Sequence, residues 1–235
     1  MMQVIRNIKE FDKLLSQRYV NRKFNDLEKY YQVYLKCCND NIPIKLFGYW
    51  GACNKPKADE KDCETARRFI EFINIMRNNL NIEIEVDIIL SDMHSFANGY
   101  NGEIIYSYLK EISELFTYEK HIKTRYLKEI WERYEIEYRI EKNLIHTEEI
   151  WNDLSVSMKL EEQAKKFAFN KRNVIERAQY YYTMRLIESE FLSSYYKDSI
   201  FFTFSSDSLK SLYPKQPSIY LWSIRRGTSK APWLE

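Results

Sequence analysis

The sequence predicts an α/β protein that forms a single domain, residues 1–235, with a mainly parallel central sheet flanked by helices. The chain is 45% hydrophobic and 30% charged and contains only 5 Gly and 5 Pro, a composition typical of a folded globular domain. Two apolar strand segments are each followed by a loop and an amphipathic helix, the order found in parallel βαβ units. These observations exclude disordered, collagen-like and low-complexity classes.

The first forty residues predict two amphipathic helices packed on the rest of the domain. Their apolar positions repeat at helical spacing. In the first helix these are Ile5, Ile8, Phe11, Leu14 and Leu15, and in the second Leu27, Tyr30, Tyr31, Tyr34 and Leu35.

Two strand–loop–helix units follow. The expected elements are a strand at Ile42–Trp50, a helix at Asp62–Leu80, a strand at Ile82–Leu90 and a helix from Glu103 to about Phe116. Gly48 and Gly51 permit backbone angles that a side chain would forbid. Because ligands of parallel sheets bind at the carboxyl ends of the strands, we expect the site at the loops Gly48–Lys57 and Ser91–Asn101.

The second half of the chain predicts a long helical region and then two strands. Breaks are expected near Asn143 and Asn170–Asn173, and the last helix is expected at Asn173–Leu192. The closing strands are expected at Ile200–Phe204 and Ser218–Ile224, joined by a Pro-containing turn.

The first loop carries side chains that suit a polar or anionic ligand. Its candidate substrate-binding residues are Gly48, Trp50, which we expect to be exposed, Cys53, Asn54 and Lys57. A lysine between a strand and the N-terminus of a helix suits a phosphate or a carboxylate. The alternatives are that Asn54, Pro56 and Asp59 only form the turn and cap the helix, and that Cys53 is a small buried hydrophobic residue.

The second loop is the stronger signal. Asp92 and His94 leave the end of a very apolar strand two residues apart, and Asn98 follows as a substrate-binding candidate. Strand alternation would put Asp92 and His94 on the same side, where a carboxylate orients an imidazole for catalysis or both bind a polar substrate. The alternative is a turn-forming Asp92 and a partly buried His94.

The last helix carries a polar stripe. Arg177, Tyr181, Arg185 and Glu188 follow one another at spacings of four, four and three, which places them on one face. Such a stripe is either a solvated salt-bridge face or the wall of a polar pocket, and the adjacent tyrosines at 180–182 favour the pocket. Tyr181 and Glu188 are therefore catalytic candidates, together with Tyr182 near the margin of the stripe, and Arg177 and Arg185 are substrate-binding candidates.

Positive charge gathers in two places, although 36 basic against 34 acidic residues leave a net charge of only +2. The candidate RNA-binding residues are Lys120, Lys123, Arg125 and Lys128 in the first cluster and Arg225, Arg226 and Lys230 in the second. Such patches bind the phosphates of a polyanion in a salt-dependent way, and the alternative is a solvated surface.

Metal ions and a membrane are not expected partners. The four cysteines and three histidines show no spacing typical of a zinc site. No run of about 18 apolar residues is present, and the N-terminal residues alternate charged with apolar side chains, unlike a signal peptide. We therefore expect a cytoplasmic protein without a metal.

In their order along the chain, these features resemble the tRNA-dependent cyclodipeptide synthases. The matching features are the Gly-containing loop at Gly48–Asn54, the strand end Asp92-Met93-His94, a basic stretch at Lys120–Lys128 expected to be helical, the fragment LKEIWERYEIEYR, and the late helix with Tyr181, Tyr182, Glu188 and Glu190. The resemblance implies a Rossmann-like fold related to class I aminoacyl-tRNA synthetases, and synthesis of a diketopiperazine from two aminoacyl-tRNAs.

Two features of that family have no match here, its acyl-acceptor serine in the first loop and its Tyr-x-x-x-Glu spacing. They leave open a divergent, arginine-using branch in which Glu188 or Glu190 holds a guanidinium.

A second resemblance is to isonitrile synthases, which are also Rossmann-like. The matching residues are Asn54, Lys57, Asp62 and Glu64 around the first loop, Ser91-Asp92 at the second strand end, and Pro232-Trp233 near the C-terminus. This resemblance implies a free amino acid and a sugar phosphate as substrates.

We therefore expect an aminoacyltransferase that makes a cyclodipeptide from aminoacyl-tRNAs in specialised metabolism. Isonitrile synthesis and non-catalytic RNA binding are the alternatives. A Tyr or Glu of the last helix would hold the substrate α-amine and relay its proton, and backbone amides near Gly48 would stabilise the oxyanion. An aminoacyl ester is already activated, so no cofactor is expected.

Overall fold

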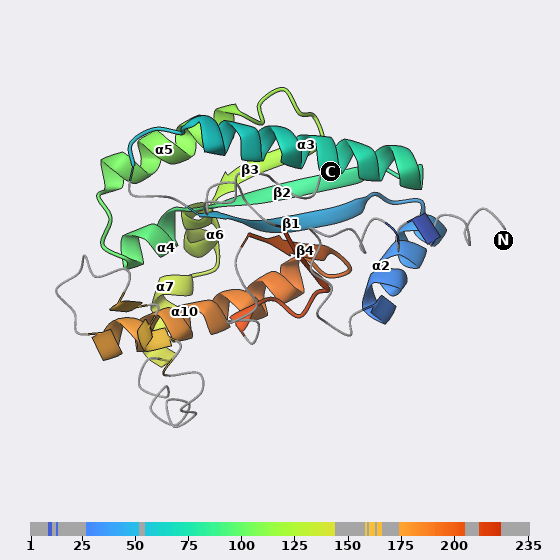
Figure 1. Ribbon diagram of the computed structural model, residues 1–235. Helices are drawn as coiled ribbons and strands as arrows, with labels where there is room; N and C mark the ends of the chain where they lie inside the picture. Colours follow the sequence, from blue (N-terminus) through green and yellow to red (C-terminus); the bar gives the residue numbers. More distant parts are fainter. Residues whose placement is uncertain are drawn as a thin grey trace.

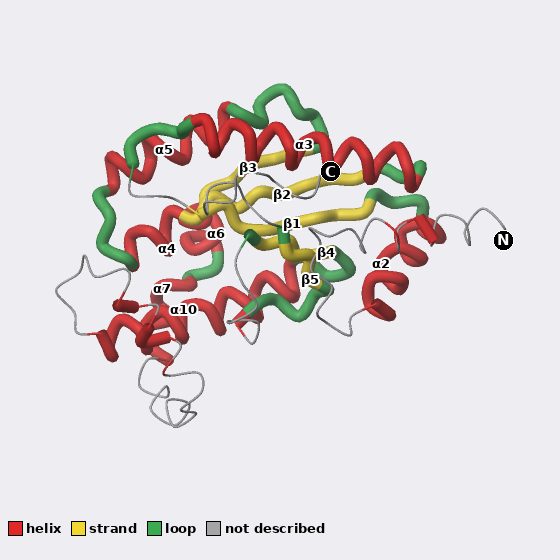
Figure 2. The backbone as a smooth tube through the Cα atoms, viewed as in Figure 1, coloured by secondary structure: helices red, strands yellow, loops and turns green. Residues whose placement is uncertain are grey.

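Five parallel strands form the centre of the protein (Figures 1 and 2). The computed structural model describes residues 27–51, 55–143, 174–204 and 212–221, with short stretches at 9–10, 13, 158, 160–162 and 164–165. The strands are β1 (Ile44–Gly51), β2 (Ile84–Ser91), β3 (Ile122–Tyr126), β4 (Ile200–Thr203) and β5 (Ser218–Tyr220), in the order β3-β2-β1-β4-β5. The predicted α/β class with a parallel sheet is confirmed.

The strand order places a change of direction at β1. The chain moves from β1 through β2 to β3 on one side and returns to β4 and β5 on the other, with every pairing parallel. In doubly wound sheets, ligands bind outside the carboxyl ends of the strands where the order reverses. The carboxyl end of β1 is therefore the expected position of a site.

Helices cover both faces of this sheet (Figure 1). The described helices are α2 (Leu27–Asp40), α3 (Glu60–Leu80), α4 (Asp92–Ala97), α5 (Gly102–Glu114), α6 (Leu127–Arg133), α7 (Ile136–Asn143) and α10 (Val174–Tyr195). Figure 1 shows α3 and α5 along one face and α7 and α10 along the other. Within the described ranges, no helix is long and apolar enough to cross a membrane.

Successive side chains of a strand belong alternately to two apolar cores, one on each face of the sheet. In β1, Leu46 and Trp50 belong to the core that contains Phe69 of α3, whereas Phe47 belongs to the core on the α10 side. The ring of Phe47 stacks on Tyr196, with centroids 4.1 Å apart. Because successive strand residues point to opposite faces, neighbouring residues at the end of β1 serve different faces of the sheet.

Four of the expected helices are confirmed with boundaries shifted by a few residues: α2, α3, α5 and α10. α2 packs against the sheet through Tyr30 and Tyr34, which lie in the same core as α3 and α5. Asp59 caps α3 in a capping box with Asp62, as the turn-and-cap reading predicted. The expected helix at residues 5–15 lies largely outside the described residues, as does the end of the last expected strand.

Two expectations for the middle of the chain are wrong. The stretch Lys120–Lys128 is not a helix, because Ile122–Tyr126 form β3 at the edge of the sheet. Its residues alternate between basic side chains and Ile122, Thr124 and Tyr126, and this period of two is typical of a half-buried strand; lysines are also common on edge strands. The second correction is that the expected loop after β2 begins with the short helix α4.

Gly48 is required by close packing and not by unusual backbone angles. Among the described glycines only Gly99 has a positive φ. A Cβ added at Gly48 would lie 2.1 Å from the carbonyl oxygen of Phe202 in β4, whereas one at Gly51 would meet no atom within 4 Å. The absence of a side chain at Gly48 thus permits β1 and β4 to pair.

We expect Gly48→Ala to lower the free energy of unfolding by about 3 kcal/mol, because the added methyl group must displace the backbone of β4. Gly51→Ala is the matched control, with an expected change within about 0.5 kcal/mol. Urea unfolding followed by tryptophan fluorescence measures both. Equal stability of the two variants would contradict the steric explanation.

Candidate active site

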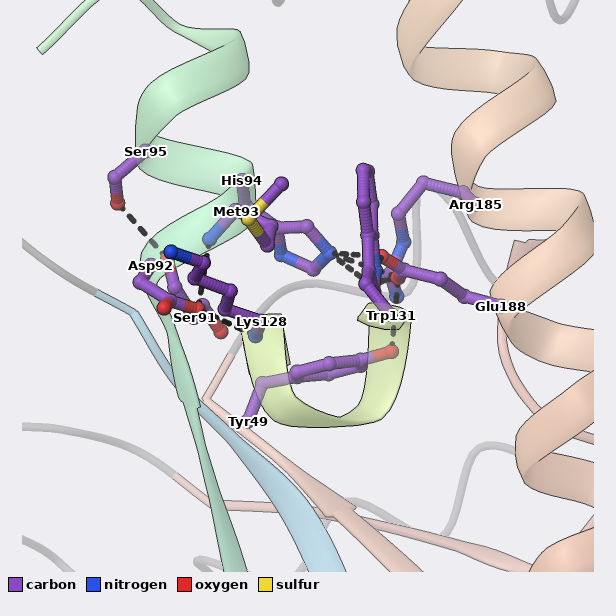
Figure 3. A network of polar contacts seen from close by, with 10 residues as sticks. All are labelled: Tyr49, Ser91, Asp92, Met93, His94, Ser95, Lys128, Trp131, Arg185 and Glu188. Atoms are coloured by element: carbon purple, nitrogen blue, oxygen red, sulfur yellow. Dashed lines mark hydrogen bonds and ion pairs between the residues drawn. The ribbon is translucent and has the colours of Figure 1, made fainter. Parts of the chain in front are cut away.

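A buried carboxylate, Glu188, lies at the centre of a polar network (Figure 3). Its side chain is 2% exposed. Oε1 accepts hydrogen bonds from Trp131 Nε1 at 2.9 Å and from His94 Nε2 at 3.0 Å. Oε2 lies 2.8 Å from the same His94 nitrogen and accepts from Tyr49 Oη at 3.0 Å. Arg185 Nη1 completes the set, at 3.2 Å from Oε2.

The network assembles at the carboxyl edge of the sheet. Tyr49 is near the end of β1, His94 lies in α4 directly after β2, and Trp131 lies in α6 directly after β3. Arg185 and Glu188 come from α10, the helix that precedes β4. β1 and β2 end level with each other, since Gly51 pairs with Ser91. The edge predicted from the βαβ order is therefore the edge at which these polar side chains meet.

Glu188 and Arg185 are held as an ion pair inside the protein. Burial raises the pKa of Glu188, but the charges and hydrogen bonds of His94, Arg185 and Trp131 outweigh it and hold the pKa below the ordinary value. For Arg185, burial lowers the pKa, whereas Tyr49, Tyr181 and Glu188 raise it above the ordinary value. Both groups are charged at neutral pH.

His94 is oriented by Glu188 and keeps one ring nitrogen open. Because both carboxylate oxygens lie within 3.0 Å of Nε2, the proton is assigned to that nitrogen. Nδ1 forms no hydrogen bond within the described residues, and the side chain is 12% exposed. An imidazole with a carboxylate at Nε2 and an open Nδ1 has the geometry of a general base.

Two tyrosines flank the imidazole. The ring centroids of Tyr49 and Tyr181 lie 5.0 Å and 6.4 Å from that of His94. Burial is the main cause that raises the pKa of both phenols. Both therefore stay protonated at neutral pH, and Tyr49 donates its proton in the hydrogen bond to Glu188.

Part of the polar stripe of the last helix lies in this network. Arg185 and Glu188 are buried and Tyr181 is half-buried. Arg177 lies two turns earlier, in the first turn of α10. Tyr182, expected to be catalytic, packs instead in a separate apolar cluster with Leu160 and Leu212.

Glu190 does not belong to this site. Its side chain is 70% exposed and lies 4.0 Å from Arg139. Two residues along a helix are separated by about 200° of rotation, so Glu188 and Glu190 face in different directions. The expected substrate-binding role of Glu190 is therefore wrong for this pocket.

Asp92 lies beside the site but does not orient His94. Its Oδ1 accepts hydrogen bonds from the backbone N–H groups of Met93 at 2.9 Å and Lys128 at 3.0 Å, and so caps α6. Oδ2 is buried and has no partner in the described part of the chain, and burial raises the pKa of this carboxyl. The expected pairing with His94 is wrong, because α4 begins at Asp92 and its side chains diverge along a helix.

The first loop contributes differently from expected. Trp50 is fully buried and packs against Phe116 and Phe204, so the expectation of an exposed Trp50 is wrong. Gly48 lies inside β1 between Ile88 and Phe202, not at a loop where amides could stabilise an oxyanion. Cys53 and Asn54 lie outside the described residues.

In this loop, Lys55 is the lysine that forms ion pairs with described residues. It forms ion pairs with Asp59 at 2.6 Å and with the buried Asp62 at 2.5 Å. The hydroxyl of Tyr108 also donates to Asp62, at 2.9 Å. Lys57 is exposed, and Asn98 is the half-buried C-cap of α4.

A cavity of about 670 Å³ adjoins the network next to Trp131 and Met93. Its other lining residues are Lys128, Glu132, Glu135, Glu137, Tyr138 and Glu141. Lys128 lies 3.7 Å from Glu132. Four carboxylates against one lysine make this opening acidic.

The predicted tRNA-binding residues that the structure describes have different surroundings. Lys120, Lys123 and Lys128 are exposed around β3 and α6. Arg125 instead pairs with the buried Asp87 at 3.2 Å. Arg225, Arg226 and Lys230 lie outside the described residues.

Tyr49 and Trp131 are the site residues that sequence reasoning missed. Tyr49 is adjacent to Trp50 at a strand end, and the alternation rule shows that only one of the two faces the site. Whether Tyr49 or Trp50 faces the site depends on which helices pack on each face of the sheet, and the local sequence does not determine that packing. Trp131 lies in a segment with helical periodicity, where nothing distinguishes it from a core residue.

We expect Glu188→Gln to lower the free energy of unfolding by about 3–5 kcal/mol at pH 7, because it leaves Arg185 buried without its counter-charge. The pKa of Glu188 is depressed below its ordinary value of 4.5, so its contribution is fully present above about pH 4.5 and is lost as pH falls through the lower folded value. Urea titrations from pH 7 to pH 3 should therefore show the variant approaching the wild type.

Glu190→Gln, an exposed change on the same helix, is the matched control for this series. Its expected effect is within about 0.5 kcal/mol. A stability difference between Glu188→Gln and the wild type that does not change with pH would rule out the charged state of Glu188 as its cause.

Comparison with known proteins shows the fold. No protein-family model matches the sequence, and no curated protein sequence matches it. The structure is similar to the PvcA protein from Pseudomonas aeruginosa, with a TM-score of 0.62 and 12% identity, over 98% of this chain and 87% of that one. It is also similar to tyrosyl-tRNA synthetase from Pyrococcus horikoshii, solved with L-tyrosine, with a TM-score of 0.50 and 13% identity over 87% of this chain and 52% of that one.

A solved cyclodipeptide synthase is also among the similar structures. This is the CDPS from Staphylococcus haemolyticus, with a TM-score of 0.48 and 10% identity over 83% of this chain and 95% of that one. The protein thus has the Rossmann-like fold of PvcA and of the tyrosyl-tRNA synthetase.

Proposed function

We propose that this protein is a biosynthetic enzyme that acts on the amino group of an amino acid, with His94 as its general base. The observation that carries the proposal is the buried Glu188–His94 pair, which leaves Nδ1 of the imidazole open at the carboxyl edge of the sheet. The similar tyrosyl-tRNA synthetase was solved with L-tyrosine, which supports an amino acid as the substrate.

In this mechanism His94 moves the proton and Glu188 positions His94. A substrate α-ammonium is not nucleophilic until it loses a proton, and Nδ1 accepts that proton. Glu188 then stabilises the imidazolium through Nε2, 2.8 Å away. Glu188 itself receives donors from four side chains, Tyr49, His94, Trp131 and Arg185. Its acceptor sites are occupied, so it does not hold the substrate amine as the sequence suggested.

The reaction we assign is of the isonitrile-synthase type, with an amino acid and a sugar phosphate as substrates. Two parts of that resemblance lie at the carboxyl edge or next to the first loop. Ser91 ends β2 and Asp92 begins α4, and Asp62 is a buried acid at the start of α3. The likeness to PvcA extends over nearly the whole chain.

We expect His94→Gln to reduce product formation about 100-fold or more, because a general base contributes at least that factor. Mass spectrometry of the small molecules made by a bacterium that expresses the protein measures the effect, and a new isonitrile is the expected product. His121→Gln, which changes a partly exposed histidine at the sheet edge, is the control and should leave the product level unchanged. Full activity of His94→Gln would refute the assigned base.

Synthesis of a cyclodipeptide from aminoacyl-tRNAs is the second candidate. It is favoured by the tyrosyl-tRNA-synthetase fold and by the exposed lysines Lys120 and Lys123 beside β3. The same mass spectra distinguish the two reactions, because this candidate yields a diketopiperazine.

Under the main proposal, the double variant Lys120→Glu/Lys123→Glu should make as much product as the wild type. Reversing two exposed charges weakens phosphate binding in a salt-dependent way but leaves the Glu188–His94 pair untouched. Product yield and filter binding of charged tRNA at low and high salt measure the effect. A diketopiperazine that disappears together with tRNA binding would establish the second candidate instead.

A further inference from the structure

Arg185 carries more hydrogen-bond donors than the described protein uses. Its guanidinium has five N–H groups, and within the described residues only Nη1 donates a hydrogen bond, to Glu188 Oε2 at 3.2 Å. Nε and Nη2 form no hydrogen bond within the described residues, although the side chain is only 5% exposed. Neither nitrogen is a fully buried atom without a partner in the described part of the chain, so this edge stays accessible to a water or a ligand.

The open edge of this guanidinium is held in a fixed plane. The group lies over the ring of Tyr49, with 4.6 Å between Cζ and the centroid, and near the ring of Tyr213 at 5.9 Å. The ion pair with Glu188 fixes the opposite side through Nη1. A planar fork of this kind is preorganised to bind both oxygens of one carboxylate, which a lysine cannot do.

We infer that the Nε–Nη2 edge of Arg185 binds the α-carboxylate of a free amino acid; this inference rests on the proposed function. Arg185 Nη1 lies 3.3 Å from His94 Nε2, so the proposed carboxylate contact and the proposed base belong to one site. Glu188 and Arg185 balance each other, so a zwitterion enters without leaving a net buried charge. An aminoacyl ester has no α-carboxylate and leaves the Arg185 donors unpaired.

The test uses purified full-length protein and the twenty proteinogenic L-amino acids as probes. Thermal shift identifies the amino acids that bind, and calorimetry compares each binder with its carboxamide and methyl ester, which keep the amine and the side chain. We expect affinities about 10- to 100-fold lower for the amide and the ester, because a bidentate charge-assisted contact is lost. Equal affinities of acid, amide and ester would overturn the inference, as would the absence of binding by any amino acid.

Arg185→Lys separates carboxylate recognition from a structural role. The lysine keeps the positive charge for Glu188 but removes the fork, so the preference for acid over amide should collapse while the folded spectrum persists. Arg139→Lys, at an exposed arginine paired with Glu190, is the matched control and should keep the preference. If Arg185→Lys does not fold, the wild-type comparison of acid, amide and ester still decides the question.

Failure of this inference is distinct from failure of the proposed function. A wild-type protein that makes an isonitrile while binding amide and acid equally keeps its function and loses the carboxylate site. A protein that makes a diketopiperazine and binds no free amino acid loses both the isonitrile reaction and the site.

Discussion

The burial of one negative charge governs the arrangement of this protein's carboxyl edge. A carboxylate removed from water is unfavourable unless donors replace its hydration. Glu188 finds these donors in Tyr49, His94, Trp131 and Arg185. Tyr49, His94 and Trp131 come from β1, α4 and α6. Arg185 lies one turn before Glu188 in α10. The carboxylate therefore fixes how α10 sits against β1, α4 and α6.

In this arrangement the fixed negative charge and the groups open to a substrate belong to different residues. Glu188 is saturated by protein donors and has a depressed pKa, so it serves as a fixed negative charge. The groups that remain open are Nδ1 of His94 and the outer edge of Arg185, one an acceptor and the other a donor. Both residues contact Glu188, so their mutual position follows from those contacts. Preorganisation of this kind is what makes such groups effective on a substrate.

The sequence was informative about periodic elements and about the edge of the sheet, and much less about the contacts. The βαβ order and the helical spacing in α3, α5 and α10 predicted the fold class, and the stripe containing Arg185 and Glu188 was identified from spacing alone. β3 was missed because a short edge strand with basic residues resembles a charged helical segment over so few residues. Tyr49 was missed and Trp50 chosen because alternation does not say which face of a strand meets the site. Asp92 was paired with His94 because the start of α4 is not visible in the local pattern.

The distances along the chain within the network also bear on how the protein folds. Tyr49 and Glu188 are 139 residues apart in sequence and His94 and Glu188 are 94 apart. Contacts of such high sequence separation form late, because the entropy of closing a long loop must be overcome first. On the ribosome, β1, β2 and β3 emerge well before α10, so until that helix is synthesised the nascent sheet presents an apolar face that includes Phe47 and Ile89. The site consequently acquires its geometry only after α10 has been synthesised, and chaperone protection is most useful in the interval before that.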